Sequence, residues 1–454
     1  MFTFFTKGAL LIGLIASSIA ASAQQTVLDD YIQQAFNSNK GLQEQHIQLD
    51  KALYALKEAK SLFGPDVTFL ASYVKSQGGR TIDFPLGDIL NPVYGSLNQL
   101  TGSHFPMMEN AKFQLNPDNF LDTKVRTSMP LINAEIYYNQ QIKKEQISQQ
   151  QAAVNVYKRQ LVQDIKTAYF QYYQTVQAVA IYNSALALIN ENIRINESMV
   201  RNGVRNNTAL YRSKTEKEKT DASINQAENA RENAKAYFNF LLNRDLRDSI
   251  TLDSGLLSQP AAGALAYGDV NSREELQQYK HAISAYELNT KLQRAYIIPK
   301  LSTFLDLGSQ GAPITFDNSS RYYMFGVNLE WSLFTFHKSK YRIRQAETNV
   351  AAIRMAASQT VDQLQLQLQQ ARNNYATAIR NFNAATTQLD FAERYYRDQL
   401  KVYKEGQLLY LELLDAQNQL TQARLQIAVT QAGVQTAFAA VERAQASYNI
   451  DINK

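Results

Sequence analysis

The stretch VYKEGQLLYLELLDAQNQLTQAR, residues 402–424, places a single glycine, Gly406, between two very long helical patterns. A second stretch, MVRNGVRNNTALYRS at residues 199–213, places Gly203 in the same situation. A glycine that follows a long heptad pattern can adopt a left-handed conformation and end the helix, so that the next helix returns beside the first. Both glycines are therefore predicted to form the tips of helical hairpins.

An internal duplication explains the spacing of these tips. Gly406 lies 203 residues after Gly203, and LFT at 333–335 lies 202 residues after LIN at 131–133. Two offsets of about 200 residues indicate two copies of one unit. The predicted organisation is a first repeat at 24–245, a connector at 246–272 and a second repeat at 273–454.

Residues 1–23 have the pattern of an export signal. Lys7 supplies a positive charge, residues 9–20 are apolar, and Ala21-Ser22-Ala23 is a small-residue cleavage site. An N-terminal membrane anchor is the alternative, but the apolar run is short for the ~20 residues that a span requires. The mature chain is therefore expected to be exported.

The composition favours long elements and excludes several kinds of chemistry. Only 18 Gly and 9 Pro occur in 454 residues, which is few for a chain with many loops. The absence of cysteine excludes disulfides, thiolate metal sites and a lipidated cysteine. The net charge of +5 is weak, and no basic tract is present, so nucleic acid is not an expected partner.

Alternating apolar and polar residues predict four strands, two in each repeat. The segment between the first two is rich in Gly, Pro and Asn and has no sustained period, so a loop without regular structure is expected at 77–119. A shorter loop is expected at 308–320. The predicted strands are residues 67–73, 121–131, 301–307 and 323–333.

Two long helices, at 134–202 and 339–405, should each lead to a hairpin tip. At 1.5 Å per residue such a helix is on the order of 100 Å long. Seven-residue rows of large residues, such as Leu368, Tyr375, Phe382, run beside rows of alanine, which allow close coiled-coil packing. The fold class expected is mainly α, with a long antiparallel coiled-coil α-barrel and four strands per chain.

Four strands cannot form a membrane β-barrel alone, because a sheet in lipid must leave no unpaired edge. Bacterial barrels begin at about eight strands. Three copies of this chain would supply twelve strands, each with an apolar row for lipid and a polar row for the lumen. We therefore expect a homotrimer that closes a 12-strand barrel.

The repeated order of helix, strand, loop, strand and long hairpin resembles the TolC-like outer membrane efflux family over essentially the whole mature chain. The most specific likeness is YKEGQLLYLELLDA at 403–416, which is similar to the second tip motif of that family. The resemblance implies a trimeric barrel in outer-membrane lipid and a twelve-helix tunnel in the periplasm. It also implies a passive exit duct whose tips dock a periplasmic adaptor protein and an inner-membrane transporter. Drug efflux and type I protein secretion both use such a duct.

The same resemblance implies a gate at the periplasmic tip. The acids six and nine residues after the second glycine are Glu412 and Asp415, and the latching tyrosine three residues before it is Tyr403. Where the family has an arginine and an aspartate, this chain has Leu408 and Ala209, so Arg205 is a candidate replacement charge.

Carboxylates from three copies around one narrow axis would repel one another and attract cations. The expected pore is therefore nearly closed and prefers cations. The alternative is that Glu412 and Asp415 are only solvated charges on a helix surface.

Two other classes of protein compete with the duct. An exported coiled-coil scaffold, or a periplasmic adaptor without a pore, would have the heptads and the signal but would not need four strands. A soluble exported enzyme would need a catalytic constellation, and the sequence has no nucleophile motif or phosphate loop. The four histidines, at 46, 104, 281 and 337, are scattered without metal-ligand spacing. No catalytic residue, metal or cofactor is expected.

Overall fold

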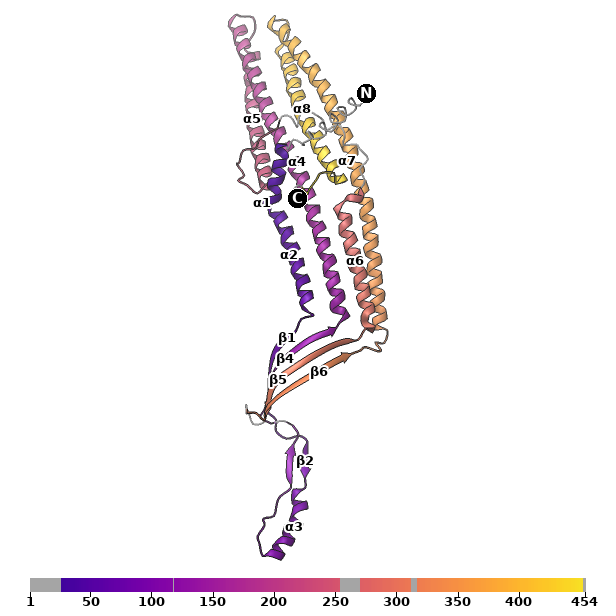
Figure 1. The fold of residues 1–454 in the computed structure, drawn as a ribbon. Helices are drawn as coiled ribbons and strands as arrows, with labels where there is room; N and C mark the ends of the chain where they lie inside the picture. Colours follow the sequence, from indigo (N-terminus) through magenta and orange to yellow (C-terminus); the bar gives the residue numbers. More distant parts are fainter. Residues whose placement is uncertain (1–25, 117, 254–269, 312–316, 452–454) are drawn as a thin grey trace, which may run out of the picture. The chain divides into compact units, whose positions relative to one another are not determined.

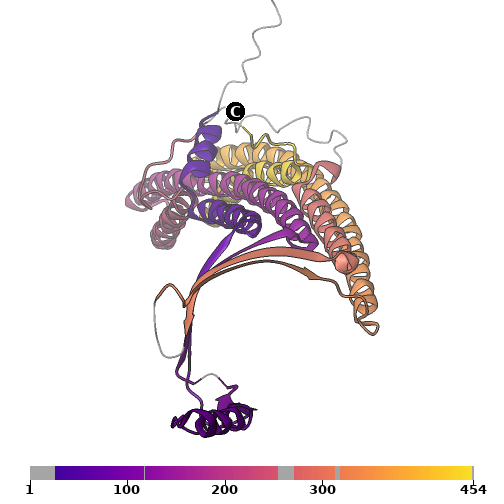
Figure 2. The ribbon, with the colours of Figure 1, turned by 60° about the horizontal axis from the view of Figure 1, so that its bottom comes forward.

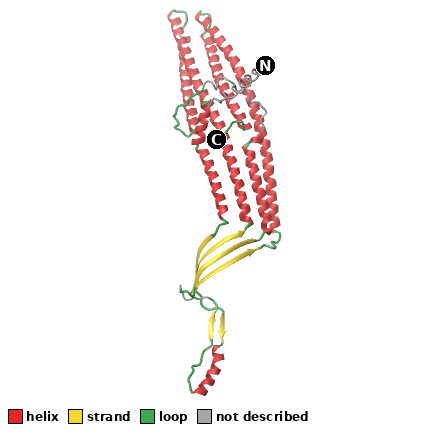
Figure 3. Cartoon of the chain, viewed as in Figure 1, coloured by secondary structure: helices red, strands yellow, loops and turns green. Residues whose placement is uncertain are grey.

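A computed structural model gives the fold for residues 26–116, 118–253, 270–311 and 317–451. The chain is mainly helical, with long paired helices and four long antiparallel strands (Figures 1 and 3). The helices are α1 (Val27–Ser38), α2 (Lys40–Ser61), α3 (Leu86–Thr101), α4 (Ala134–Arg201), α5 (Thr208–Leu241), α6 (Glu274–Arg294), α7 (Lys338–Lys404) and α8 (Tyr410–Gln445), with 3-10 turns η2 (Val270–Ser272) and η3 (Ala295–Ile297). The strands are β1 (Asp66–Val74), β2 (Thr81–Phe84), β3 (Ala111–Gln114), β4 (Phe120–Ile132), β5 (Lys300–Gly311) and β6 (Arg321–Glu330).

Contacts divide the chain into two compact units. The helical unit comprises Met1–Ala52, Gln146–Ile283 and Ala351–Lys454, and the sheet unit comprises Leu53–Glu145 and Ser284–Val350. Each predicted repeat contributes to both units, so the division into repeats remains a prediction about the sequence. The predicted signal at 1–23 and most of the connector lie outside the described residues.

The sheet unit contains a four-stranded antiparallel sheet in the order β1-β4-β5-β6. The strands lie side by side in one curved layer, which Figure 2 shows from below. The register places apolar side chains from neighbouring strands in rows on one face, as the alternation predicts. One such row is Phe69, Val125, Leu307 and Tyr323, and the next is Val67, Thr127, Leu305 and Phe325.

The opposite face of the sheet carries polar side chains. Arg126 on β4 donates from Nε and Nη2 to the two carboxylate oxygens of Asp306 on β5. Both distances are 2.7 Å, so the pair is bidentate. The Asp122 carboxylate accepts from Lys124 on the same strand and from the Tyr322 hydroxyl on β6. One face of the folded sheet is therefore mainly apolar and the other mainly polar.

Two strands end at other residues than predicted, and a third contains an irregularity. β5 continues to Gly311, so the first four residues of the predicted loop at 308–320 belong to the strand. β6 ends at Glu330, and Trp331 and Leu333 lie beyond it although they continue the alternation. In β4, Pro130 lies at a register shift, where a residue without an N–H can be tolerated.

The prediction that residues 77–119 lack regular structure is wrong. The segment contains the two-stranded β2–β3 ladder and the sixteen-residue helix α3. Its composition was misleading because Pro92 and Gly95 lie inside α3, where both residue types are unfavourable. The ladder also joins residues about thirty positions apart, a pairing that a local period does not reveal.

The predicted heptad rows form the cores between the long helices. On α7 the row from Val361 to Tyr403 is buried or half-buried at every position, and so is the alanine row from Val350 to Ala392. Near the ends of α7 and α8 these rows form one cluster, which includes Tyr396, Leu413, Leu420 and Ala423. None of the helices among the described residues has an apolar stretch sufficient to cross a membrane.

Candidate functional site

The two hairpin tips have the same backbone design. Gly203 and Gly406 have φ of +68° and +78°, the left-handed region that glycine enters without strain. The N–H of Val204 reaches the carbonyl of Met199, and the N–H of Gly203 reaches that of Val200. Gly406 and Gln407 make the equivalent bonds to Tyr403 and Val402. Both helices therefore end in a Schellman motif, which positions the residues around each glycine.

Tyr403 lies in the interior of the paired tips. Its side chain is fully buried in the cluster described above, and its ring centre is 5.9 Å from that of Tyr410. Burial raises the pKa of the Tyr403 hydroxyl, which stays protonated and donates to the Asn196 side chain of α4. Tyr403 thus joins α7 to the first hairpin of the same chain.

Arg205 connects the first tip to the second. Its guanidinium donates to the backbone carbonyls of Gly406, at 3.4 Å, and Leu408. The same group lies over the Tyr403 ring, 4.8 Å from the ring centre, in a cation–π arrangement. The residue that sequence reasoning selected as a replacement charge therefore contacts both Tyr403 and the second tip.

Glu412 and Asp415 are exposed in the single chain and lie one turn apart on the first turns of α8. They line one surface pocket of about 410 Å³ together with Arg212, Tyr395 and other residues. Asp415 accepts from Gln419 at 2.7 Å. Both carboxylates are therefore accessible to solvent or to another chain. Within the part of the chain that the structure describes, neither forms a hydrogen bond or ion pair with Tyr403 or Arg205.

The two positions that depart from the family motif are both part of the apolar packing. Leu408 and Ala209 are half-buried and pack against the cluster around Tyr403 and Leu413. No side-chain charge is available at either position. The polar link between the tips is instead made through the backbone carbonyl of Leu408, which accepts from Arg205.

Sequence reasoning missed a set of buried amides behind the tips. Asn192 donates to Gln417 of α8 at 2.7 Å, and Gln417 donates to the Ala185 carbonyl at 3.3 Å. Asn196 donates to Ser213 of α5 at 3.1 Å. Because Asn192 and Asn196 are four residues apart on one helix face, their spacing was the available signal. Buried polar pairs of this kind fix the register of packed helices.

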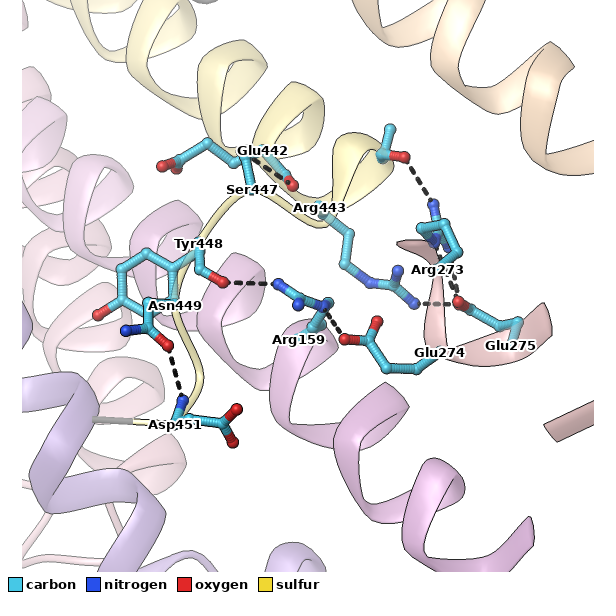
Figure 4. A network of polar contacts seen from close by, with 11 residues as sticks. Arg159, Arg273, Glu274, Glu275, Glu442, Arg443, Ser447, Tyr448, Asn449 and Asp451 are labelled. Atoms are coloured by element: carbon cyan, nitrogen blue, oxygen red, sulfur yellow. Dashed lines mark hydrogen bonds and ion pairs between the residues drawn. The ribbon is translucent and has the colours of Figure 1, made fainter. Parts of the chain in front are cut away.

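A second polar network, in the helical unit, joins α4, α6 and α8 (Figure 4). Glu275 accepts at 2.7 Å from both Arg273 and Arg443, and Arg159 donates to Glu274 at 2.6 Å. Burial of Glu275 opposes its ionisation, but the hydrogen bonds and charges of Arg273 and Arg443 outweigh that effect and lower its pKa to about 2. The network therefore ties the last turns of α8 to α4 and to the first turn of α6.

The geometry agrees with the similarities to known proteins. Residues 270–447 match the family model described as "Outer membrane efflux protein". The outer membrane efflux protein BepC of Brucella suis biovar 1 (strain 1330) is 24% identical over 276 residues. That alignment covers 58% of this chain and 58% of BepC, so it spans less than two thirds of the relative.

Solved channel structures share the fold over nearly the whole chain. They include CusC (TM-score 0.73, 16% identity), the Campylobacter jejuni channel CmeC (0.70, 15%) and Vibrio cholerae VceC (0.69, 14%). Each match covers 92% of this chain, and they cover 91%, 85% and 95% of the three channels respectively. At these identities the likeness is one of fold.

The long paired helices and the four-stranded antiparallel sheet are the fold of the TolC-like channel structures. The match at residues 270–447 makes the second half of the chain similar to the outer membrane efflux protein family.

Proposed function

We propose that three copies of this chain close into an exit duct across the outer membrane, as part of a tripartite efflux or type I secretion system. The sheet carries the proposal. Among the described residues, β1 and β6 each have a single neighbour in the four-stranded sheet. Edges of this kind are not tolerated in lipid, and pairing of β1 with β6 of the next copy would remove them.

The side chains on the two faces of the sheet suit this assembly. Tyr323 is 80% exposed and Phe325 66% exposed in the single chain, as expected for a surface that lipid covers. The opposite face, with the Arg126–Asp306 pair, would line a water-filled lumen. An exported scaffold or adaptor without a pore gives no reason for an apolar outer face on a sheet.

The paired tips are proposed as the periplasmic gate and docking end of the duct. Glu412 and Asp415 would supply six carboxylates in the trimer, and Arg205 and Tyr403 would hold the two hairpins of each copy together. A periplasmic adaptor protein and an inner-membrane transporter would dock at the tips and supply the energy, since the duct itself is passive.

The test combines the mass of the purified protein with its conductance. We expect the processed chain to be extracted from the outer membrane by detergent with the mass of a trimer, and to insert into planar bilayers as small, cation-preferring channels. A water-soluble monomer without channel activity would contradict the proposal and favour a scaffold. Crosslinking from cysteines introduced at Asn207 and Leu409, followed by identification of the attached proteins, tests the proposed partners.

A further inference from the structure

The β1–β4 connection carries a folded module that the duct itself does not require. We define the α3 module as residues 81–114, which comprise β2, α3, the extended strap after α3, and β3 (Figure 1). Asn98 donates to the Phe105 carbonyl at 3.0 Å and accepts from the Phe105 N–H at 2.7 Å. Asn91 makes the same two-way pair with Met108, at 2.9 and 2.8 Å. The strap is therefore clamped to α3 at two points that are two helical turns apart.

Further contacts show that the strap and α3 pack closely. The carboxylate and N–H of Asp88 pair with the side-chain amide of Asn110 at 3.0 and 3.1 Å. The rings of Tyr94 and Phe105 stack with centres 5.7 Å apart. At Gly87 an added Cβ would lie 2.3 Å from the Met108 carbonyl oxygen, so only glycine allows this approach. One side of α3 is thus fully used to hold its own strap.

Another side of α3 is apolar, and no other part of the described chain covers it. Ile89, Val93, Leu97 and Leu100 recur at intervals of four, four and three residues, so they lie on one face of the helix. Their exposed fractions are 58%, 52%, 36% and 84%. An ordered helix with four large aliphatic residues facing solvent indicates an interaction surface. We call this set the α3 stripe.

The charge of α3 argues against a lipid surface as the occupant. Helices that lie on membranes usually carry lysine or arginine on the polar face, which attracts anionic headgroups. Residues 86–101 contain neither, and their one charged residue, Asp88, is paired with Asn110. A second apolar helix face is a better match for the uncharged stripe.

The position of the module in the chain supplies such a face. β1 follows α2 and leads into the module, so the module is connected to the end of β1 opposite the end that joins α2. β1 is also an edge strand. In the proposed trimer each β1 would stand at a boundary between copies, and three modules would project from the same rim.

We propose that the α3 stripes of three copies pack against one another and form a helical cap over the outer mouth of the duct. This inference rests on the proposed trimer, and the occupant of each stripe is the α3 of a second copy. The cap adds an outer constriction at the end of the duct opposite the periplasmic tips. Because apolar contacts hold the cap, the outer mouth would open without any change in the acidic residues at the periplasmic tips.

Cysteine crosslinking tests the cap without background, because the chain contains no native cysteine. In the full-length protein, Val93→Cys and Leu97→Cys change stripe residues, and Gln99→Cys changes an exposed residue on another side of α3. Disulfides form when the two Cα atoms are about 4.4–6.8 Å apart. After oxidation with copper-phenanthroline we expect both stripe variants to shift from the monomer to a dimer band on denaturing gels, and a reductant to reverse the shift. Gln99→Cys is expected to stay monomeric.

Light scattering of the same detergent samples separates the two proposals. A trimeric mass with monomeric Val93→Cys and Leu97→Cys would overturn the cap and leave the duct intact. A monomeric mass would overturn the duct and the cap together. If a fluorophore on Leu97→Cys were quenched by spin-labelled lipid in phosphatidylcholine vesicles, the stripe would be a lipid contact and the cap would be wrong.

Discussion

The guanidinium of Arg205, on the first hairpin tip, lies 4.8 Å from the ring centre of Tyr403, on the helix that leads to the second. Arg205 also donates to the backbone of that second tip, so one side chain joins two segments that are about two hundred residues apart in sequence. Because this one side chain holds both tips, the contact should control how the hairpins separate.

Replacing Arg205 by alanine is expected to loosen the paired tips. The loss of a cation–π contact and a charge-assisted hydrogen bond should weaken their association by about 2 kcal/mol. We expect a larger single-channel conductance in planar bilayers and longer open times. Arg201→Ala is the matched control, because Arg201 is an exposed arginine one turn earlier on the same hairpin. Equal conductance in the two variants would show that Arg205 does not restrain the tips.

Replacing both Glu412 and Asp415 by alanine should also open the tip, but for an electrostatic reason. In the proposed trimer this change removes six carboxylates near one axis, so the repulsion among them and the attraction of cations should both fall. The expected result is a several-fold higher conductance and a reversal potential, in a KCl gradient, closer to that of an unselective pore. Glu228→Ala, which removes an exposed acid from α5, should change neither quantity. Unchanged selectivity in the double variant would leave these acids as ordinary surface charges.

Alanine substitution of two glycines should have opposite effects on stability. At Gly406 the φ of +78° is unfavourable for alanine, so Gly406→Ala should lower the free energy of unfolding by about 1–2 kcal/mol. Gly433 lies inside α8 with open space around an added Cβ, so Gly433→Ala should raise it by about 1 kcal/mol. Urea unfolding followed by circular dichroism in detergent measures both changes. A destabilised Gly433→Ala would indicate that a neighbouring copy fills that space in the assembly.

Glu275 should make the stability of the helical unit depend on acid pH. Its pKa is lowered to about 2, against an ordinary value of 4.5, so its contribution is fully present above pH 4.5 and is lost as the pH falls toward 2. The shift corresponds to about 3 kcal/mol. Glu275→Gln should lose about this amount at pH 7 and show a flatter dependence of unfolding on pH between 5 and 3. If the variant keeps the pH dependence of the parent, another carboxylate is responsible.

The helical scaffold and the sheet were predictable because their signals are local and repeated. Gly203 and Gly406 interrupt uniform heptads, and Tyr323 to Leu329 alternate with polar neighbours, so one period specifies each element. The pairing of Arg205 with the Leu408 carbonyl was not predictable, because it depends on two tips meeting in space. The α3 module was missed for a similar reason: Asn91 and Asn98 bind a strap that follows the helix, and nothing in a periodic pattern indicates that contact.

The open edges of β1 and β6 have a genetic consequence. In the proposed trimer each chain needs its neighbours to complete the barrel. An altered edge strand in one chain would therefore prevent all three chains from closing it. If normal and edge-defective chains are made in equal amounts and mix at random, only about one in eight of the proposed trimers would contain three normal chains. A defective allele would then be dominant in the cell, whereas a loss of expression would be recessive.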